Sequence, residues 1–144
     1  MQFKLVFYGE PVPAQRPRFS RKTGRAYTPP AYSNYKSQLA GEIHYQFRKF
    51  ISPPPPTGSK ERRDYFKANR YKLSVKAYRS RDTGDIDNFI KTVMDALKDS
   101  GLILNDSQIR RLVDSDILID KISPRIEFTL TKMQNGQIPL AIGD

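Results

Sequence analysis

The sequence contains no cysteine and no tryptophan, and one histidine among its 144 residues. The absence of cysteine excludes thiolate metal sites, thiol nucleophiles, redox dithiols and disulfide scaffolds. Long hydrophobic runs are also absent, so no segment reaches the roughly 18–20 apolar residues that a bilayer requires. The first ten residues alternate and include Glu10, where a signal peptide would be continuously apolar. We therefore predict a cytoplasmic protein of one domain, covering residues 1–144.

Acidic residues are scarce in the first part of the chain. Residues 1–81 hold 18 basic and 4 acidic side chains, whereas residues 82–144 hold 7 basic and 11 acidic ones. A basic half favours a polyanionic partner, and an acidic half favours a bound cation. The combination indicates nucleic-acid binding together with a metal site. A basic surplus that only keeps the domain soluble is the simpler alternative.

Hydrophobic periodicity predicts four strands and two helices. The strands are expected at Gln2–Tyr8, Tyr71–Arg79, 113–119 and 125–133. The helices are expected at 33–50, capped by Ser33 or Asn34, and at Ile86–Ser100, ended by Gly101. These elements predict a mixed α/β (α+β) domain, with about four strands in one sheet and two helices against one face.

Basic segments that contain proline lie on each side of the first predicted helix. Residues 10–30 contain five prolines, so we expect an extended arm with a short hairpin near Thr23 and Gly24. Five cations on this arm form a predicted phosphate clamp: Arg16, Arg18, Arg21, Lys22 and Arg25. Residues 52–70 are predicted to be a proline-rich, basic loop whose charged end is mobile or begins a short helix. Residues 135–144 are expected to be a flexible tail.

Acidic side chains gather at the start of the second predicted helix. Asp85 precedes the helix and Asp87 lies in its first turn, one turn before Lys91. Two facing carboxylates repel unless a cation lies between them, and Mg²⁺ prefers one or two carboxylates with water and phosphate oxygens. Asp106, in the turn beyond the helix, is the candidate third ligand if that turn returns to the helix start. Lys91 is placed to stabilise a developing phosphorane.

Each of these residues also has a structural interpretation. Asp85 alone is an ordinary helix cap. Asp87 with Lys91 is an ordinary surface ion pair. Asp106 is an ordinary turn or cap residue, and His44 is interpreted as a packing residue of the first helix. Spacing alone leaves the structural and the catalytic interpretations open.

The pattern Asp-Ile-Asp-Asn-Phe-Ile-Lys at 85–91, followed by Asp-Ser-Gln-Ile at 106–109, resembles the RusA family of Holliday junction resolvases. The similarity extends over most of the chain, to Gly9-x-Pro11-x-Pro13, Arg16-Pro17-Arg18, Tyr27-Thr28-Pro29 and Pro124-Arg125-Ile126-Glu127. The resemblance implies that Asp85, Asp87 and Asp106 bind the metal and, together with Lys91, carry catalysis. It also implies dependence on magnesium or manganese, a homodimer, and a bacterial or prophage origin.

Two features depart from the family pattern. Asn105 stands where the family usually has a first aspartate before Ser-Gln. Asp114 and Asp116 occupy a strand in which family members tend to carry a lysine. This change either removes DNA contacts or adds carboxylates near the metal. We interpret Asp114, Asp116 and Asp120 first as outward-facing strand residues.

Together, the residues and the resemblance predict a Mg²⁺-dependent endodeoxyribonuclease that resolves four-way junctions by paired phosphodiester hydrolysis, in DNA recombination and repair. Phosphate contacts are predicted for the five arm cations and for Arg79 and Arg81. Four aromatic residues are candidates for stacking at the branch point, with packing as the simpler interpretation: Tyr8, Phe19, Tyr27 and Tyr32. Two alternatives stay open: a protein that binds branched or single-stranded DNA without cutting it, and a nuclease specific for flaps or forks.

Overall fold

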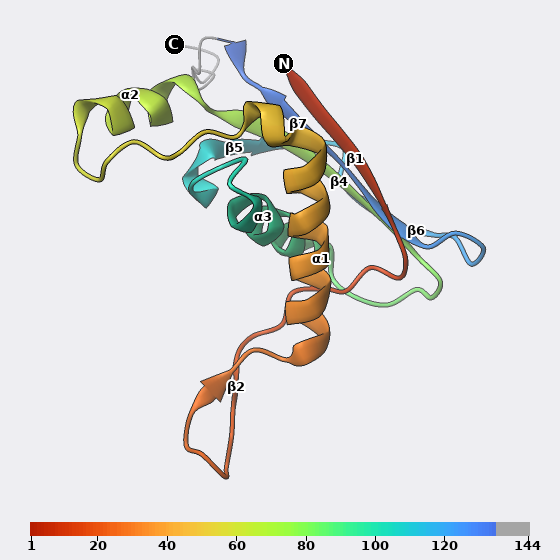
Figure 1. The fold of residues 1–144 in the computed structure, drawn as a ribbon. Coiled ribbons are helices and arrows are strands. Elements are labelled where there is room, and N and C mark those ends of the chain that lie inside the picture. The colour runs from red at the N-terminus through yellow and green to blue at the C-terminus, as the bar shows by residue number, and fades with distance from the viewer. Residues whose placement is uncertain (135–144) are drawn as a thin grey trace, which may run out of the picture.

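A computed structural model describes residues 1–134, and the tail predicted at 135–144 lies outside them. Its centre is a five-stranded mixed sheet (Figure 1). The strands are β1 (Gln2–Tyr8), β4 (Tyr71–Arg79), β5 (Ile109–Leu112), β6 (Asp116–Ile119) and β7 (Arg125–Lys132). Strand β7 lies between β1 and β4 and is antiparallel to both, whereas β5 and β6 run parallel to β4.

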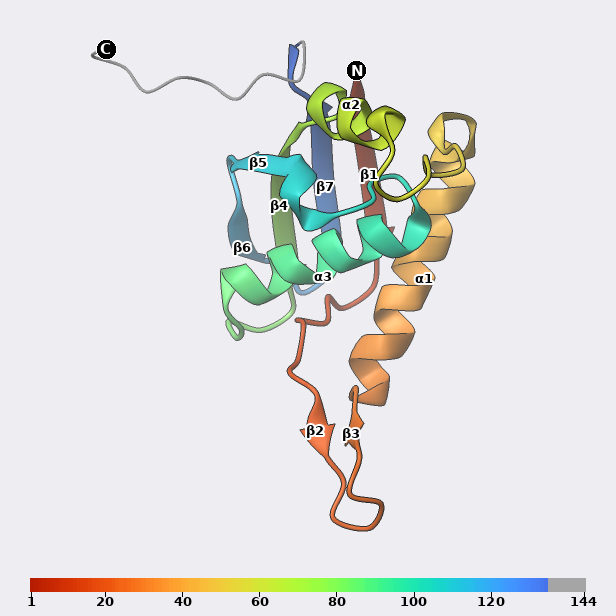
Figure 2. The same ribbon diagram turned by 90° about the vertical axis from the view of Figure 1, so that its left-hand side faces the viewer.

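Two helices, α1 (Pro30–Phe47) and α3 (Ile86–Ser100), cover one face of the sheet (Figures 1 and 2). Strand β4 supplies a buried residue to this layer at every second position, with the fully buried Leu73 and Val75 at its centre. Helix α3 contributes Phe89 and Leu97 to the same layer, and both are also fully buried. The predicted fold class and the two-helix layer are confirmed, with one more strand in the sheet.

Helix α1 begins earlier than predicted. Its first residue is Pro30, with Pro29 at the N-cap position, and neither Ser33 nor Asn34 caps it. Proline suits the first helical position because its φ is preset and its missing N–H would have had no partner there. A 3₁₀ turn, η1 (Arg48–Phe50), follows α1 directly. The end of α3 is as predicted, because Gly101 adopts a φ of 85° and closes the helix.

Of two further segments, one differs from the prediction and one takes a form that the prediction left open. The strand expected at 113–119 is shortened to β6 (Asp116–Ile119), because Asp114 has a φ of 43° and interrupts the extended backbone, and an additional strand, β5 (Ile109–Leu112), precedes it. In the loop expected at 52–70, the charged end forms a short helix, α2 (Lys60–Ala68), which is one of the two forms expected there. Ser59 caps this helix by accepting a hydrogen bond from the N–H of Arg62 at 3.1 Å.

The expected hairpin in the basic arm is present. Strands β2 (Arg18–Phe19) and β3 (Ala26–Tyr27) pair with each other and with no strand of the main sheet. Figures 1 and 2 show this hairpin projecting away from the body of the molecule, below the start of α1. Within residues 1–134, no helix combines the length and apolar character that crossing a membrane requires.

Candidate active site

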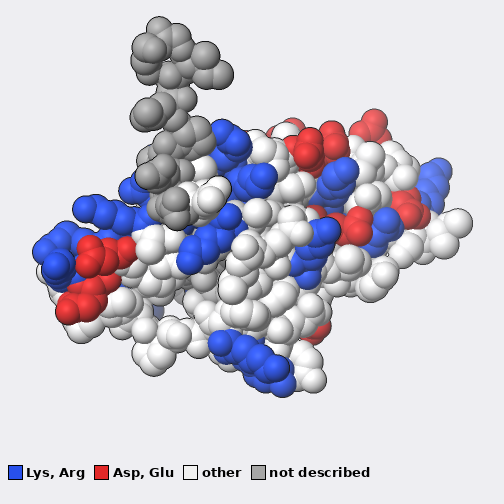
Figure 3. Space-filling model, turned by 90° about the horizontal axis from the view of Figure 1, so that it is seen from above, with Lys and Arg blue, Asp and Glu red and all other residues white. Residues whose placement is uncertain are grey.

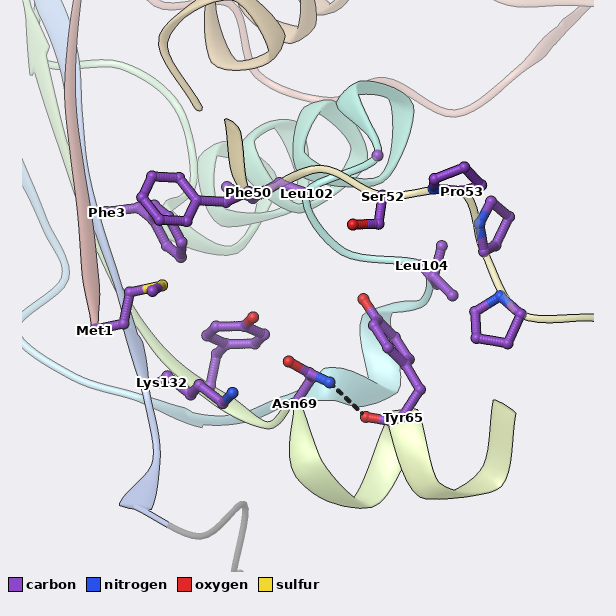
Figure 4. A pocket seen from close by; sticks show the side chains of 14 residues that line it. Met1, Phe3, Phe50, Ser52, Pro53, Tyr65, Asn69, Leu102, Leu104 and Lys132 are labelled. Atoms are coloured by element: carbon purple, nitrogen blue, oxygen red, sulfur yellow. Dashed lines mark hydrogen bonds between the residues drawn. The ribbon is translucent and has the colours of Figure 1, made fainter. Parts of the chain in front are cut away.

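A cavity of about 370 Å³ lies between the start of β1, the polyproline segment and α2 (Figure 4). Aromatic and apolar side chains such as Phe3, Phe50 and Leu102 line it, and at one edge Asn69 donates a hydrogen bond to the backbone oxygen of Tyr65 at 2.8 Å. None of its lining residues is acidic. The predicted hydrolytic residues therefore lie elsewhere on the molecule.

Asp85 and Asp87 lie together at the N-terminal end of α3, and both are exposed. Asp85 occupies the N-cap position, but its carboxylate accepts no capping hydrogen bond. Asp87 accepts one hydrogen bond, from the N–H of Asn88 at 3.0 Å. The positive end of the helix dipole favours both negative charges. The carboxylate of Asp85 thus does not perform the helix-capping role that is expected of a lone aspartate at this position.

The loop before α3 is held rigidly by Arg79, the last residue of β4. Its side chain is only 10% exposed: it pairs with Glu10 at 3.2 Å, donates to the carbonyl of Thr83 at 3.0 Å and stacks over Phe89. Gly84 is required next to it, because its φ is 98° and an added Cβ would lie 2.8 Å from the Phe89 ring. Arg79 is therefore not available to contact phosphates, which corrects that prediction, whereas Arg81 is exposed.

A third carboxylate, that of Asp116, lies near those of Asp85 and Asp87. A shallow hollow of about 620 Å³ is lined by Asp85, Asp87 and Asp116 together with Gly84, Ile86, Ser115 and Ile117. Strand β6 is parallel to the last part of β4, with Asp116 opposite Lys76 and Ile119 opposite Arg79, and its first residues lie beside the start of α3. Of the two interpretations of this strand, the one that adds carboxylates beside Asp85 and Asp87 agrees with the structure.

Asp106 lies apart from Asp85 and Asp87 within one chain. Its nearest charged neighbour is Lys98, whose Nζ is 3.4 Å from Oδ1. Lys98 comes eleven residues after Asp87, about 16 Å further along the axis of α3. Across residues 1–134, no three acidic or histidine side chains are grouped closely enough to hold one metal ion. The expectation that the turn returns Asp106 to the helix start is therefore wrong for the isolated chain.

The position of Asp106 is set by Gln108, which is 1% exposed. The side-chain oxygen of Gln108 accepts hydrogen bonds from the N–H groups of Leu104 and Asn105, and its amide donates to the carbonyl of Asn69 at 3.0 Å. Asn105 completes a capping box around the 3₁₀ turn η2 (Asp106–Gln108). This turn is bound to the start of β4, whereas Asp85 follows its end. Gln108 belongs to the motif Asp-Ser-Gln-Ile at 106–109, but the motif alone does not indicate its positioning role. That role follows from its burial and its hydrogen bonds.

Replacing Gln108 by Ala is expected to lower the free energy of unfolding by about 1–3 kcal/mol, because buried N–H and C=O groups lose their partners. Urea denaturation with a circular dichroism readout measures the change. Ser107→Ala is the matched control, because Ser107 is exposed in the same turn and only its backbone N–H and carbonyl form hydrogen bonds. Equal midpoints for the two variants would contradict the role given to Gln108.

Lys91 pairs with Asp95, not with Asp87. The Lys91 ammonium is 3.7 Å from Asp95 and its side chain is 60% exposed. Asp95 also lies 3.7 Å from Lys98 and accepts a short hydrogen bond from the Tyr32 hydroxyl. Burial, and then this hydrogen bond, raise the pKa of Tyr32 above its ordinary value, so the hydroxyl stays a donor. Tyr32 is therefore a packing residue, as its simpler interpretation held.

Family comparison agrees with the arrangement of motifs. Residues 8–131 match the family model of endodeoxyribonuclease RusA. The chain belongs to the RusA family. It is also similar to the uncharacterized protein YqaN of Bacillus subtilis (strain 168), with 29% identity over 144 residues that cover 90% of this chain and 96% of that protein. The range matched to RusA contains Asp85, Asp87, Lys91 and Asp106.

Other aspartates of this RusA family chain have structural roles. Asp120 accepts hydrogen bonds from the N–H groups of Ile122 and Ser123 and pairs with Arg125 at 2.8 Å. The Ser123 N–H, followed by the Arg125 guanidinium, holds the pKa of Asp120 below its usual value. Asp120 therefore fixes the turn between β6 and β7. Like Asp120, His44 has a structural contact, since its Nδ1 lies 3.1 Å from the carbonyl of Ser100.

The predicted phosphate-binding cations differ in their surroundings. All five in the arm are exposed, and residues 16–27 contain no acidic residue. Helix α2 carries Lys60, Arg62, Arg63 and Lys67 but also Glu61 and Asp64, and Figure 3 shows blue and red side chains mixed at the α2 end of the molecule. Of the two basic surfaces, the arm and helix α2, the arm is therefore the more uniformly positive.

Proposed function

We propose that this member of the RusA family is a divalent-metal-dependent endonuclease that resolves four-way DNA junctions by hydrolysing one phosphodiester bond in each of two strands. The observation that carries the proposal is the hollow at the start of α3. There the carboxylate of Asp85, which has no hydrogen-bond or ion-pair partner among residues 1–134, lies beside Asp87 and Asp116. A structural role does not account for three carboxylates in one open hollow.

The donor atoms suit a hard divalent cation. Carboxylate oxygens are the ligands that Mg²⁺ and Mn²⁺ prefer. Oδ1 of Asp106 is buried and accepts no hydrogen bond within residues 1–134, and its charged neighbour is the Lys98 ammonium at 3.4 Å, so the site around it already favours a positive charge. We assign Asp85, Asp87 and Asp106 as the metal-binding residues. The bound ion would supply Lewis-acid polarisation of the phosphate and a lower pKa for a coordinated water.

Lys91 is assigned the stabilisation of charge on the scissile phosphate. Its ammonium is held from one side by Asp95 at 3.7 Å, and most of the side chain remains exposed to an arriving substrate. A positive charge that is already positioned lowers the energy of a phosphorane without reorganisation at the moment of reaction. Asp95 thus acts as a positioning residue for Lys91.

A homodimer is part of the proposal, with Asp106 of a second copy completing the carboxylate pair of the first. Its support is the incompleteness of one chain, in which Asp106 lies beside Lys98 and away from Asp85 and Asp87. A two-fold axis would create two equivalent sites, as a symmetric four-way substrate with paired cuts requires. The third carboxylate of the same hollow, Asp116, is the alternative within one chain, and it would have to move closer to Asp85 and Asp87 to share an ion with them.

Cleavage of synthetic DNA tests the proposal directly. Purified protein is incubated with a four-way junction, a flap, a fork and a linear duplex, with and without Mg²⁺ or Mn²⁺. Paired cuts in the junction that depend on the metal support the proposal. Tight binding without cleavage under either metal favours a non-cutting DNA-binding protein, and faster cutting of flaps or forks assigns the same chemistry to another substrate.

Salt dependence tests the basic surface. If six or more cations contact phosphates, affinity for the junction is expected to fall by roughly three orders of magnitude or more between 50 and 200 mM salt. Fluorescence anisotropy of a labelled junction, titrated at several salt concentrations, gives the slope. Replacing Arg21 and Lys22 by Ala is expected to reduce that slope by about two, at roughly 0.9 per contact. A flat salt dependence would contradict the phosphate clamp.

A further inference from the structure

The aromatic ring of Phe19 has no packing partner in the body of the protein. It is 71% exposed, and it does not belong to the apolar side chains that pack against the core. An exposed phenylalanine at the end of a projecting hairpin gains nothing from folding. Its neighbour across the ladder is Ala26, whose small side chain leaves one face of the ring uncovered.

Positive charges surround this ring on the hairpin. A shallow hollow of about 520 Å³ is lined by Phe19 and Tyr27 and by the cations Arg21, Lys22 and Arg25. A flat apolar surface beside several cations matches the chemistry of a nucleotide, which has an aromatic base and a charged phosphate. A duplex buries its bases in the stack, so only an unstacked base can occupy the ring face.

The hairpin is a defined structure. Backbone hydrogen bonds join Ser20 to Arg25 and Gly24 to Ser20, each at 2.9 Å. Gly24, with a φ of 67°, provides the left-handed turn at the tip. The ring is therefore presented on an ordered support, and its stacking does not require the ordering of a loose loop.

The base of the arm is attached to the helix that carries the carboxylates. The N–H of Ala14 donates to the carbonyl of Asn88 at 3.0 Å, and the Thr92 hydroxyl donates to the carbonyl of Val12 at 2.9 Å. Asn88 directly follows Asp87. The position of the hairpin is thus coupled to the first turns of α3, and DNA held by the hairpin would be held relative to the hollow.

We propose that the β2–β3 hairpin is a base-stacking site that recognises the branch point: Phe19 stacks on a nucleobase that is unstacked there, and Arg21, Lys22 and Arg25 bind the adjacent phosphates. This inference rests on the proposed function, because it takes branched DNA as the substrate. It makes Phe19 a determinant of the preference for branched DNA over duplex.

The test uses full-length protein carrying Asp87→Asn, so that DNA is bound without being cut, and a four-way junction with 2-aminopurine at the branch point. Phe19→Ala in this background is expected to weaken junction binding about ten- to hundredfold, since stacking contributes roughly 1–3 kcal/mol per base. The fluorescence increase that reports unstacking is expected to disappear. Affinity for linear duplex should stay unchanged, because the phosphate contacts remain.

Two further variants separate stacking from general effects. Phe19→Trp is expected to restore junction affinity, because it returns an aromatic face. Ile122→Ala is the matched control, since Ile122 is a 97% exposed apolar residue in the turn between β6 and β7, and it should change neither junction affinity nor the fluorescence increase. Replacing Arg21 and Lys22 by Ala is expected to weaken junction and duplex binding alike.

Unchanged junction affinity and fluorescence in Phe19→Ala would overturn the stacking site, as would equal losses on junction and duplex. If the protein with native Phe19 still cuts the four-way junction in that case, only the stacking site is refuted and the proposed function stands. If protein with native Phe19 neither binds nor cuts branched DNA, both are refuted. Thermal melting of each variant confirms that the fold is retained.

Discussion

Replacing Asp87 by Asn is expected to lower metal-dependent junction cleavage by about a thousandfold or more, while junction binding persists. The substitution keeps the size of the side chain and removes the negative charge that would hold a divalent ion beside Asp85. Losing several kcal/mol of metal-assisted stabilisation corresponds to this range, at about 1.4 kcal/mol for each factor of ten. Single-turnover cleavage of a labelled four-way junction across a Mg²⁺ titration measures the effect.

Asp99→Asn is the matched control for this experiment. Asp99 lies at the far end of the same helix and forms one partly exposed ion pair, with Lys36 at 3.4 Å. The substitution is expected to change the cleavage rate by no more than about twofold, because Asp99 does not line the hollow. Loss of its exposed ion pair should lower the stability of the fold by at most about 1 kcal/mol. Full activity of Asp87→Asn, or an equal loss in Asp99→Asn, would contradict the assignment.

Regular periodicity made the main elements predictable. Strands β1 and β4 and helix α3 have the predicted bounds, since each alternates or repeats its apolar residues over several turns or pairs. The start of α1 and the division between β5 and β6 depend instead on single backbone conformations, at Pro30 and Asp114. A periodic pattern carries no information about such local dihedral angles.

The site was predictable in part. The Asp-x-Asp spacing places two carboxylates at a helix start by local geometry alone, and the structure agrees. The approach of Asp116 and the separation of Asp106 both follow from parallel pairing of distant strands with β4. Local spacing does not determine that pairing. Arg79 was mistaken for a DNA contact for the same reason, because its ion-pair partner, Glu10, lies 69 residues away.

Mixing two inactive variants is expected to restore cleavage if each site draws residues from two copies. In a heterodimer of Asp87→Asn with Asp106→Asn, one site would carry both defects and the other would carry neither. Random exchange of subunits therefore gives about a quarter of the wild-type number of sites, by symmetry. A cruciform plasmid separates the outcomes, because one intact site per dimer nicks the plasmid whereas two linearise it.

The pair Asp85→Asn with Asp87→Asn is the matched control for mixing. Both residues line the same hollow, so each site of their heterodimer keeps one defect and no nicking is expected. If Asp87→Asn mixed with Asp106→Asn also fails to nick, although tagged subunits are shown to exchange, Asp106 does not act across copies. Loss of cleavage in Asp116→Asn together with full activity in Asp106→Asn would then place the third carboxylate in the hollow of the same chain, where Asp116 lies beside Asp85 and Asp87.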